Sequence, residues 1–241
     1  MNLILIEPSE LVDDRCVLTG HRAEHLRVFL HAAPGTVFQV GILEGAIGQG
    51  TVLAVTAEAV TFSVRCEETP LAPWFDLVLA LPRPRSLKRI LFQTAAMGVR
   101  NIFLIGAQKV EKSYFSMHLL RPEEYRPVLI DGLMQGKTTR VPQVSIVPRF
   151  GELWERLPAD VGLRLIANPA SERVSFSSQK GPVLIAVGPD GGWTESENAA
   201  FLAHGFYPLT LGARPLRTDT AVIALAAVIQ DRLACADAEL L

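Results

Sequence analysis

The first 70 residues carry short apolar runs separated by turn residues. The runs predict strands at residues 3–6, 37–42, 51–55 and 60–64, which are rich in Val, Ile, Leu, Phe and Thr. Glycines such as those of Gly48-Gln49-Gly50 mark the turns, and residues 22–30 form one polar helical stretch. Several short strands at this spacing predict a small β-barrel, and Pro70 and Pro73 mark its end.

From Phe75 onward, apolar strands alternate with helical stretches. We expect the strands at residues 76–81, 102–105, 144–147, 163–167, 183–187 and 207–211. We expect the helices at residues 86–97, 123–135, 151–157, 195–204 and 218–236. Ser86 is the expected N-cap of the first helix, and Pro122 and Gly136 suit the first position and the end of the second. The alternation predicts an α/β protein with a mainly parallel sheet covered on both faces.

The last of these helices is apolar nearly all round. Its apolar positions include Ala221, Val222, Ile223, Leu225 and Ile229. A helix of this kind is buried on more than one side. A subunit interface can cover the second side, so we expect a homodimer; the alternative is a central helix in a monomer.

Composition and cysteine usage narrow the class of protein. Of the 241 residues, 49% are hydrophobic and 20% are charged. No apolar run reaches the about 18 residues of a membrane span. The N-terminus lacks the basic region and apolar length of a signal peptide, which favours a cytoplasmic protein. Cys16, Cys66 and Cys235 are far apart and form no C-x-x-C pair, which indicates a reducing compartment and no metal site.

Charge is distributed unevenly along the chain. Lys and Arg against Asp and Glu number four against nine in residues 1–70, twelve against five in residues 71–150, and seven against eleven in residues 151–241. The middle segment is therefore basic, although the formal net charge of the chain is −2. A basic stretch in an otherwise acidic chain is typical of a face that binds the phosphates of a nucleic acid.

Two glycine-containing turns, each between a predicted strand and a predicted helix, lie close together in sequence. The first is Gly188-Pro189-Asp190-Gly191-Gly192, and the second begins at Leu211-Gly212. Glycine lets a backbone approach a ligand closely, and a helix N-terminus offers free N–H donors, so we expect a cofactor here. The first turn does not have the spacing of G-x-G-x-x-G and lacks the Lys-Ser/Thr of a P-loop, which argues against dinucleotide and NTPase sites.

The second turn ends in Arg217-Thr218-Asp219-Thr220, directly before the last helix. Thr218 or Asp219 can cap that helix, which is a purely structural role. Capping does not explain Arg217. An arginine at the junction of a strand and a helix favours contact with a phosphate or a substrate carbonyl.

Four cations of the basic middle segment lie at or just before the start of one predicted helix, and others follow along the segment. Those expected to contact RNA are Arg83, Arg85, Lys88, Arg89, Lys112, Lys137 and Arg140, with Arg100 and Lys109 beside them in sequence. They can form an ordinary solvated helix face. Their density and the prolines at positions 82 and 84 instead favour an electrostatic groove for phosphates.

The complete C-terminal motifs point to a family. They read Val187-Gly188-Pro189-Asp190-Gly191-Gly192-Trp193-Thr194 with Glu197, and Leu211-Gly212-x-Arg214-x-Leu216-Arg217-Thr218-Asp219-Thr220-Ala221. Weaker matches are His25 with Gly35, Met97-Gly98-Val99, and Gln135 followed by Arg140-Val141-Pro142. Together they resemble the RsmE family, the bacterial 16S ribosomal RNA uridine N3-methyltransferases of the SPOUT superfamily.

The resemblance implies a PUA-like RNA-binding β-barrel at residues 1–70 and a SPOUT methyltransferase domain with a deep trefoil knot at residues 74–241. It implies S-adenosylmethionine as cofactor, a homodimer, no metal, and 16S ribosomal RNA or the small ribosomal subunit as substrate. By position, the cofactor-binding residues would be Asn168, Gly188, Gly192, Leu211, Gly212, Leu216, Arg217 and Thr218. Relatives carry Glu-Gln-x-x-Arg where this chain has Met134-Gln135-Gly136-Lys137-Thr138, so Lys137 or Arg140 would replace that arginine. Asp190 stands where relatives have glutamate.

Methylation at N3 of uracil requires that this nitrogen lose its proton. Arg217 is the expected donor to a uracil oxygen or the adjoining phosphate, and Asp219 is a candidate base whose alternative role is helix capping. N3 lies inside a Watson–Crick pair, so the target must be unpaired or flipped out. Two alternatives stay open: a knotted methyltransferase that acts on another RNA position, such as a ribose 2′-hydroxyl, and a non-catalytic RNA-binding assembly factor.

Overall fold

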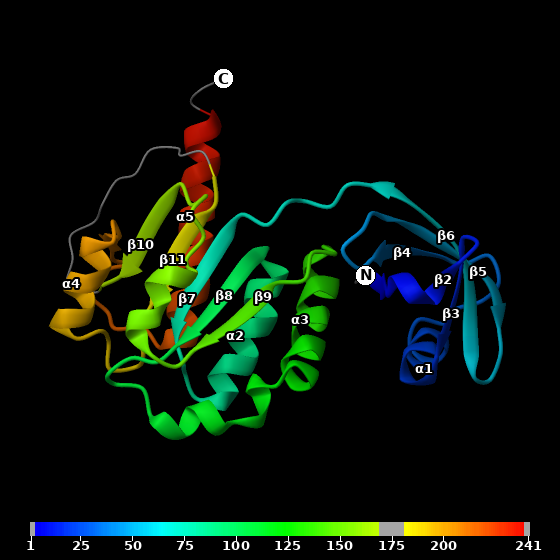
Figure 1. Cartoon of the computed structure of the whole chain (residues 1–241). Coiled ribbons are helices and arrows are strands. Elements are labelled where there is room, and N and C mark those ends of the chain that lie inside the picture. The colour runs from blue at the N-terminus through cyan, green and yellow to red at the C-terminus, as the bar shows by residue number, and fades with distance from the viewer. Residues whose placement is uncertain (1–2, 169–180, 239–241) are drawn as a thin grey trace. The chain divides into compact units, whose positions relative to one another are not determined.

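The structure is a computed structural model that describes residues 3–168 and 181–238. The chain divides into two compact units (Figure 1). The first unit is Met1–Ala72 with Ile130–Val141, and the second is Pro73–Leu129 with Pro142–Leu241.

The first unit is built on a sheet of six strands. They are β1 (Ile4–Ile6), β2 (Leu11–Val12), β3 (Arg15–Thr19), β4 (Val37–Ile42), β5 (Ile47–Val55) and β6 (Ala59–Glu68), in the order β1-β4-β5-β6-β3-β2. Only β1 and β4 pair in parallel. Helix α1 (Gly20–Val28) buries Ala23 and Leu26 against a core that includes Phe38 and Phe62. Closure of this sheet into a barrel stays a prediction.

Part of a helix from the middle of the chain packs with this first unit. The backbone N–H of Leu3 donates to the carbonyl of Met134 at 3.0 Å, and the Thr139 hydroxyl donates to the carbonyl of Gly45 at 2.7 Å. The first unit therefore contains residues 130–141 in addition to the segment that was expected to end at residue 70. These tertiary contacts join positions 94 and 131 residues apart, so no local pattern in the sequence reveals them.

The second unit contains a parallel sheet of six strands, which confirms the predicted α/β class. The strands are β7 (Phe75–Ala80), β8 (Val99–Ile105), β9 (Gln143–Val147), β10 (Leu163–Ala167), β11 (Val183–Val187) and β12 (Tyr207–Leu209), in the order β12-β10-β11-β7-β8-β9. Every residue of the central strands β7 and β11 is buried. The sheet is therefore covered on both faces, as their continuous apolar runs indicate.

Helices cover this sheet. They are α2 (Pro84–Ala96), α3 (Pro122–Gly136), α4 (Glu195–Ala203) and α5 (Thr218–Ala238), with the short 3-10 helices η2 (Lys112–Ser116), η3 (His118–Leu120) and η4 (Phe150–Arg156). The end of α3, from Ile130, and the 3-10 helix η1 (Pro8–Glu10) belong to the first unit. The expected N-cap at Ser86 is wrong, because Pro84 starts α2 two residues earlier and Ser86 is buried inside the helix. The helix predicted at residues 151–157 is the 3-10 helix η4, and the last strand ends at Leu209.

Helix α5 packs against α2 and β11 (Figure 1). Val222, Leu225, Ala226 and Ile229 are buried, whereas Ala227 is exposed on the other side. Among the described residues, therefore, the other side of the apolar helix is only partly covered. The homodimer stays a prediction. Across the residues that the structure describes, no helix has both the length and the apolar character needed to cross a membrane.

Candidate functional site

The two glycine turns meet at one edge of the larger sheet. In a parallel sheet the carboxyl ends of all strands lie on the same side, and β10, β11 and β12 are neighbours. Asn168 follows β10, Gly188 follows β11, and Leu211 lies just beyond β12. The backbone N–H of Asn168 donates to the carbonyl of Leu209 at 3.0 Å, which joins two of these loops. This edge is where open α/β sheets bind ligands.

Thr218, the first residue of α5, contacts the Gly188–Gly192 turn through its hydroxyl group. The Thr218 hydroxyl lies within donor distance of the Gly188 carbonyl, at 3.3 Å, and of Asp190 Oδ1, at 3.0 Å. Its side chain is buried, with 4% of the residue exposed. Thr218 thus acts as a donor to the turn. The sequence predicted Thr218 as a possible helix cap and did not predict this bond.

Backbone conformation explains two glycines of the first turn. Gly192 has φ of +68°, a left-handed conformation that other residues adopt with strain. A Cβ atom at Gly188 would lie 3.2 Å from three ring atoms of Trp193. Glycine at 188 therefore lets the turn pass directly over the indole ring.

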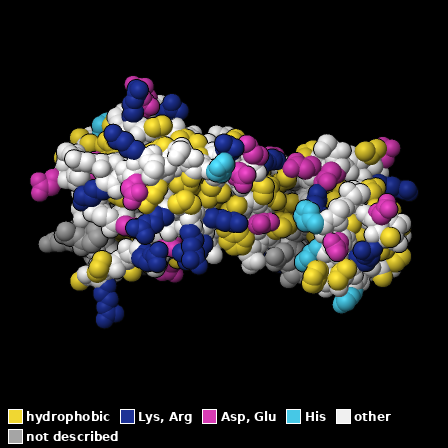
Figure 2. All heavy atoms as spheres, turned by 90° about the horizontal axis from the view of Figure 1, so that it is seen from below, with side chains coloured by type: hydrophobic (Ala, Val, Ile, Leu, Met, Phe, Trp, Pro, Cys, Tyr) yellow, Lys and Arg dark blue, Asp and Glu magenta, His cyan; other side chains and the backbone are white. Residues whose placement is uncertain are grey.

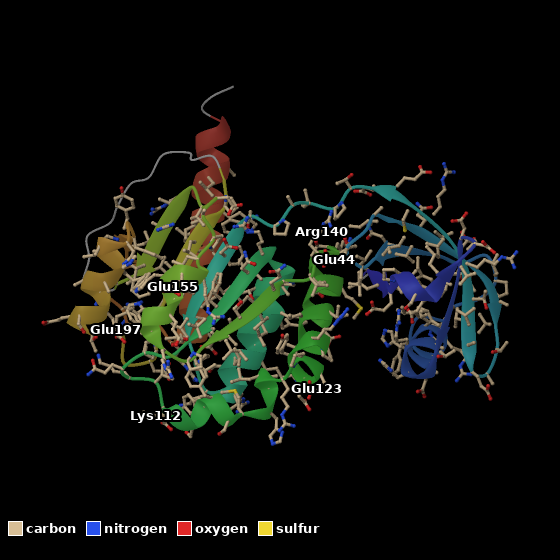
Figure 3. All side chains as sticks on the ribbon, viewed as in Figure 1. Glu44, Lys112, Glu123, Arg140, Glu155 and Glu197 are labelled. Atoms are coloured by element: carbon tan, nitrogen blue, oxygen red, sulfur yellow. The ribbon has the colours of Figure 1, made fainter. Side chains whose placement is uncertain are left out.

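A buried carboxylate connects this turn to the loop after β8. Glu197 on α4 accepts hydrogen bonds from the backbone N–H of Gln108 at 2.7 Å and of Thr194 at 2.8 Å. Lys109 Nζ in turn donates to the carbonyl of Gly191 at 2.7 Å. Figure 3 labels Glu197 on α4. The capping box formed by Thr194 and Glu197 is visible in the sequence, but the bond to Gln108 spans 89 residues and is not.

A hollow of about 190 Å³ opens among these loops. It is lined by Asn168, Gly188, Gly192, Leu216 and Thr218 of the expected cofactor residues. A second hollow of about 60 Å³ shares Asn168 and Leu216 and adds Leu211 and Gly212. The structure thus gathers seven of the eight expected residues around two adjoining hollows, and Arg217 is the exception.

Two larger hollows lie in the first unit. One, of about 550 Å³, lies along β5 and β6 and is rimmed by Arg65, Glu67 and Glu68. The other, of about 480 Å³, is lined by apolar residues of β1 and α1 together with His21 and His25. Neither contains a glycine turn at the end of a parallel strand. Size alone therefore does not single out the expected cofactor site.

The side chain of Arg217 projects into solvent, with 70% of its surface exposed. Asp219 lies beside it, with 3.9 Å between Asp219 Oδ1 and Arg217 Nε. The other oxygen of Asp219 is 2.9 Å from Nη2 of Arg89 on α2. Asp219 also accepts the backbone N–H of Thr220 at 3.1 Å. The carboxylate therefore lies between two arginines, which the sequence did not indicate.

The cations expected to contact RNA are divided between the two units. In the second unit Arg83, Arg85, Lys88, Arg89 and Lys112 are all exposed. Seen from below, several Lys and Arg side chains gather on this larger unit (Figure 2).

The other two expected cations, Lys137 and Arg140, belong to the first unit. Arg140 lies beside Glu44 (Figure 3), with 3.6 Å between Nη1 and Oε2, and donates to the Glu44 carbonyl at 3.0 Å. Arg100 is engaged elsewhere, by Asp76 and Asp160 at the opposite edge of the larger sheet.

The described cysteines are not candidates for catalysis. Cys16 is fully buried in the core of the first unit, and burial raises the pKa of its thiol to about 11. Burial also raises the pKa of the Cys66 thiol. A thiol reacts as its thiolate, so both groups are poor nucleophiles near neutral pH.

Comparison with known proteins matches this arrangement. A family model described as an RNA methyltransferase domain covers residues 67–230, so fold and loops define an RNA methyltransferase domain. A ribosomal RNA small subunit methyltransferase E of Treponema pallidum is 33% identical, over 95% of this chain and 90% of the relative. One of Borreliella burgdorferi is 27% identical, over 97% and 99%. The chain therefore belongs to the ribosomal RNA small subunit methyltransferase E family, which confirms the resemblance to RsmE.

Solved structures share the fold. A ribosomal RNA small subunit methyltransferase E from Neisseria gonorrhoeae, bound to S-adenosyl methionine, superposes with a TM-score of 0.77 at 21% identity, over 95% of this chain and 97% of that one. A methyltransferase from Legionella pneumophila, in complex with SAM, gives 0.75 at 20% identity, over 96% and 98%. At this identity the two structures support the architecture of the whole chain.

Proposed function

We propose that this protein transfers the methyl group of S-adenosylmethionine to N3 of a uridine in 16S ribosomal RNA of the small ribosomal subunit. Family membership supports the reaction class and the RNA substrate. The observation that carries the proposal is the joining of the two loops by Thr218, because it assembles a ligand site from the two most specific motifs of the chain. The reaction takes place in the cytoplasm, where small subunits are assembled.

The residues of the two hollows fit the cofactor. Glycine backbone at Gly188 and Gly192 lets a ligand approach main-chain groups, and Leu216 and Ala221 supply apolar walls. The wall also contains Trp193, whose indole N–H is buried without a partner in the described chain. S-adenosylmethionine, when bound, supplies an electrophilic methyl group on a sulfonium. Asn168, Leu211, Gly212 and Thr218 are the other residues that we assign to its binding.

We assign Arg217 to the RNA rather than to the wall of the hollow. Arg217 lies in sequence between Leu216 and Thr218, which both border the hollow, but its guanidinium faces solvent. A cation there stabilises the uracil anion that forms when N3 loses its proton, or holds the adjoining phosphate. Positioning of N3 by such contacts supplies roughly 7–11 kcal/mol in favourable cases.

Asp219 is a less suitable base than the sequence alone indicated. Its carboxylate is 13% exposed, and its Oδ2 lies 2.9 Å from Arg89 Nη2, so this oxygen is already engaged in an ion pair. We therefore assign to Asp219 mainly the orientation of Arg217, and we assign the proton of N3 to solvent. Arg89 then serves Asp219 as well as RNA.

The two units have different roles in this proposal. Residues 1–70 form a PUA-like barrel that holds RNA, with Lys137 and Arg140 on the segment that packs with it. The domain at residues 74–241 carries catalysis, and Arg83, Arg85, Lys88 and Lys112 hold RNA phosphates there. The family resemblance supports both assignments, and the exposure of the α2 cations supports the second.

We further propose a trefoil knot around the loops of the site and a homodimer. The knot rests on membership of the RsmE family. The dimer is supported by the exposed, apolar side of α5, where Ala227 is open and Ile223 and Val228 are half-buried. Sedimentation equilibrium of the protein tests it, because a monomer at micromolar concentration would contradict a stable interface.

The proposed reaction is tested by mapping the product. The protein and labelled cofactor are incubated with small ribosomal subunits that lack the modification, and the RNA is digested to nucleosides for mass spectrometry. Labelled N3-methyluridine supports the proposal. A 2′-O-methylated nucleoside would assign another RNA position, and binding of subunits without label would indicate a non-catalytic assembly factor. Free 16S RNA in a parallel reaction shows whether the assembled particle is required.

A further inference from the structure

Trp193 has an aromatic ring that packs in the core and an indole N–H that has no hydrogen-bond partner among the described residues. The residue is 8% exposed. Its ring packs against Phe201, with centroids 4.8 Å apart, and against Phe150 at 6.3 Å. Over residues 3–168 and 181–234, its Nε1 is the one buried side-chain N or O atom that has no hydrogen-bond partner.

An unpaired indole N–H is unusual inside a protein. The indole nitrogen is a donor only, so no rotation of a hydrogen satisfies it. Buried polar groups are nearly always paired, because the water that they lose must be replaced. A Phe at this position would bury the same ring face without the unpaired donor. The presence of Trp therefore indicates that the donor acquires a partner in some state of the protein.

The location of the ring indicates that this state is the ligand-bound protein. Trp193 lines the 190 Å³ hollow together with Gly188 and Thr218. The turn covers the face of the five-membered ring, since a Cβ built on Gly188 would lie 3.2 Å from Nε1, Cε2 and Cδ2. The unpaired donor thus lies beneath the turn that borders the hollow, so a ligand in the hollow is a suitable source of an acceptor.

We propose that the indole N–H of Trp193 donates a hydrogen bond to an acceptor atom of the bound cofactor. The inference rests on the proposed function, since it requires that S-adenosylmethionine occupy this hollow. The cofactor offers acceptors on its adenine, ribose and carboxylate. Trp193 is then a ligand-binding residue, and its N–H is desolvated in advance of binding. A group that is already desolvated forms this hydrogen bond without a further loss of its own water.

Trp193→Phe tests this proposal because it keeps an aromatic ring and removes the N–H donor, together with part of the buried ring. Binding of S-adenosylhomocysteine is measured by titration calorimetry. We expect the Kd of the variant to rise about 2- to 13-fold. Because Phe is smaller than the buried Trp, the melting temperature of the ligand-free protein should fall by about a few degrees, and it should fall similarly in the control below. Trp154→Phe is the matched control, because Trp154 belongs to the same aromatic cluster but lies outside the hollow. It should leave the Kd unchanged.

The outcomes separate this inference from the proposed function. If wild-type protein does not bind S-adenosylhomocysteine, the proposed function itself fails. If wild type binds and Trp193→Phe binds with the same Kd, the inference about Trp193 is overturned. A lower melting temperature with an unchanged Kd would assign Trp193 to packing only.

A second measurement uses the unaltered protein, in case the variant does not fold. The indole N–H resonances of the three tryptophans are assigned by Trp74→Phe and Trp154→Phe. On addition of S-adenosylhomocysteine, the Trp193 indole proton should move downfield and exchange more slowly with solvent. An unchanged resonance under saturating ligand would contradict the proposal.

Discussion

At the amino edge of the larger sheet, Asp76 on β7 is fully buried and accepts four hydrogen bonds from Arg100 and Asn101. Asp160 holds the other side of the same guanidinium at 2.6 Å. At the carboxyl edge, Arg217 is 70% exposed, and the indole N–H of Trp193 has no partner in the described chain. The amino ends of the six strands thus carry charged groups that pair with one another, whereas the carboxyl ends carry groups that are exposed or unpaired. The unsatisfied edge is the one that binds ligands in our proposal, and four substitutions test the contrast.

The largest effect on stability is expected from Arg100→Ala. The variant leaves the carboxylate of Asp76 buried without its cation, which typically destabilises a protein by about 3–5 kcal/mol. Chemical denaturation measures the change. Arg65→Ala, which breaks a surface pair with Glu67, should cost less than about 1 kcal/mol.

The same variant should leave the carboxyl edge intact. Affinity for S-adenosylhomocysteine should stay at the wild-type value, and a loss of binding at temperatures where Arg100→Ala is folded would contradict the separation of the two edges. Arg100 also holds the pKa of Asp160 below its usual range. The ion pair between Arg100 and Asp160 therefore stabilises the fold above the unfolded pKa of this carboxyl group, which is about 4, and the stabilisation is lost as the pH falls through the folded pKa. The variant should lack this part of the pH dependence of stability.

Arg217→Ala should show the opposite behaviour. Loss of a cation that stabilises developing negative charge lowers the methylation rate about 10²- to 10³-fold, or about 3–4 kcal/mol. The free energy of unfolding should change by less than about 0.5 kcal/mol, because the side chain is exposed. Single-turnover methylation of small subunits measures the rate. Arg217→Lys, which keeps the charge without the planar fork, should fall in between, and near-normal turnover of the Ala variant would remove Arg217 from the mechanism.

Thr218→Val probes the bond between the two loops. The shape of the side chain is retained, but the donor to Gly188 and Asp190 is lost. We expect the Kd for S-adenosylhomocysteine to rise about tenfold and the stability to fall by about 1–2 kcal/mol. Thr220→Val, two residues further along α5 and exposed, is the control. Equal effects of both variants on binding would show that the bond does not shape the site.

The smallest effect is expected from Lys88→Ala on α2. A single phosphate contact contributes without sequence preference, so RNA affinity should fall modestly at low salt. The slope of log affinity against log salt should decrease in magnitude by about 1. Arg156→Ala, an exposed cation on η4, should not change the slope. An unchanged slope for Lys88→Ala would place RNA elsewhere.

Local patterns predicted much of the larger sheet. Strands β10 and β11 begin and end where their apolar runs do, since Gly and Pro bound both runs. In the first unit β3 was missed because Arg15 and Thr19 at its ends read as polar surface, although its inward positions, Cys16 and Leu18, are fully buried. Alternation is weak evidence over so few residues.

The site was predicted in its parts but not in its connections. Glycine spacing and Arg217-Thr218 marked the loops that the structure brings together. The bonds from Thr218 to Asp190, from Glu197 to Gln108 and from Arg89 to Asp219 join residues 28 to 130 positions apart. Such pairs depend on the sheet order, which no single stretch of sequence specifies.

The chain passes between the two units three times, at residues 72–73, 129–130 and 141–142. An organisation of this kind is discontinuous, so the amino-terminal unit is not a module that can be removed by a single cut. A fragment that ends at Ala72 lacks the Met134 carbonyl that binds Leu3 and the Thr139 hydroxyl that binds Gly45. Exchange of this unit between relatives therefore requires the helical segment 130–141 to be exchanged with it. An insertion or deletion in that segment affects both units at once, which makes it a poor place for evolutionary length variation.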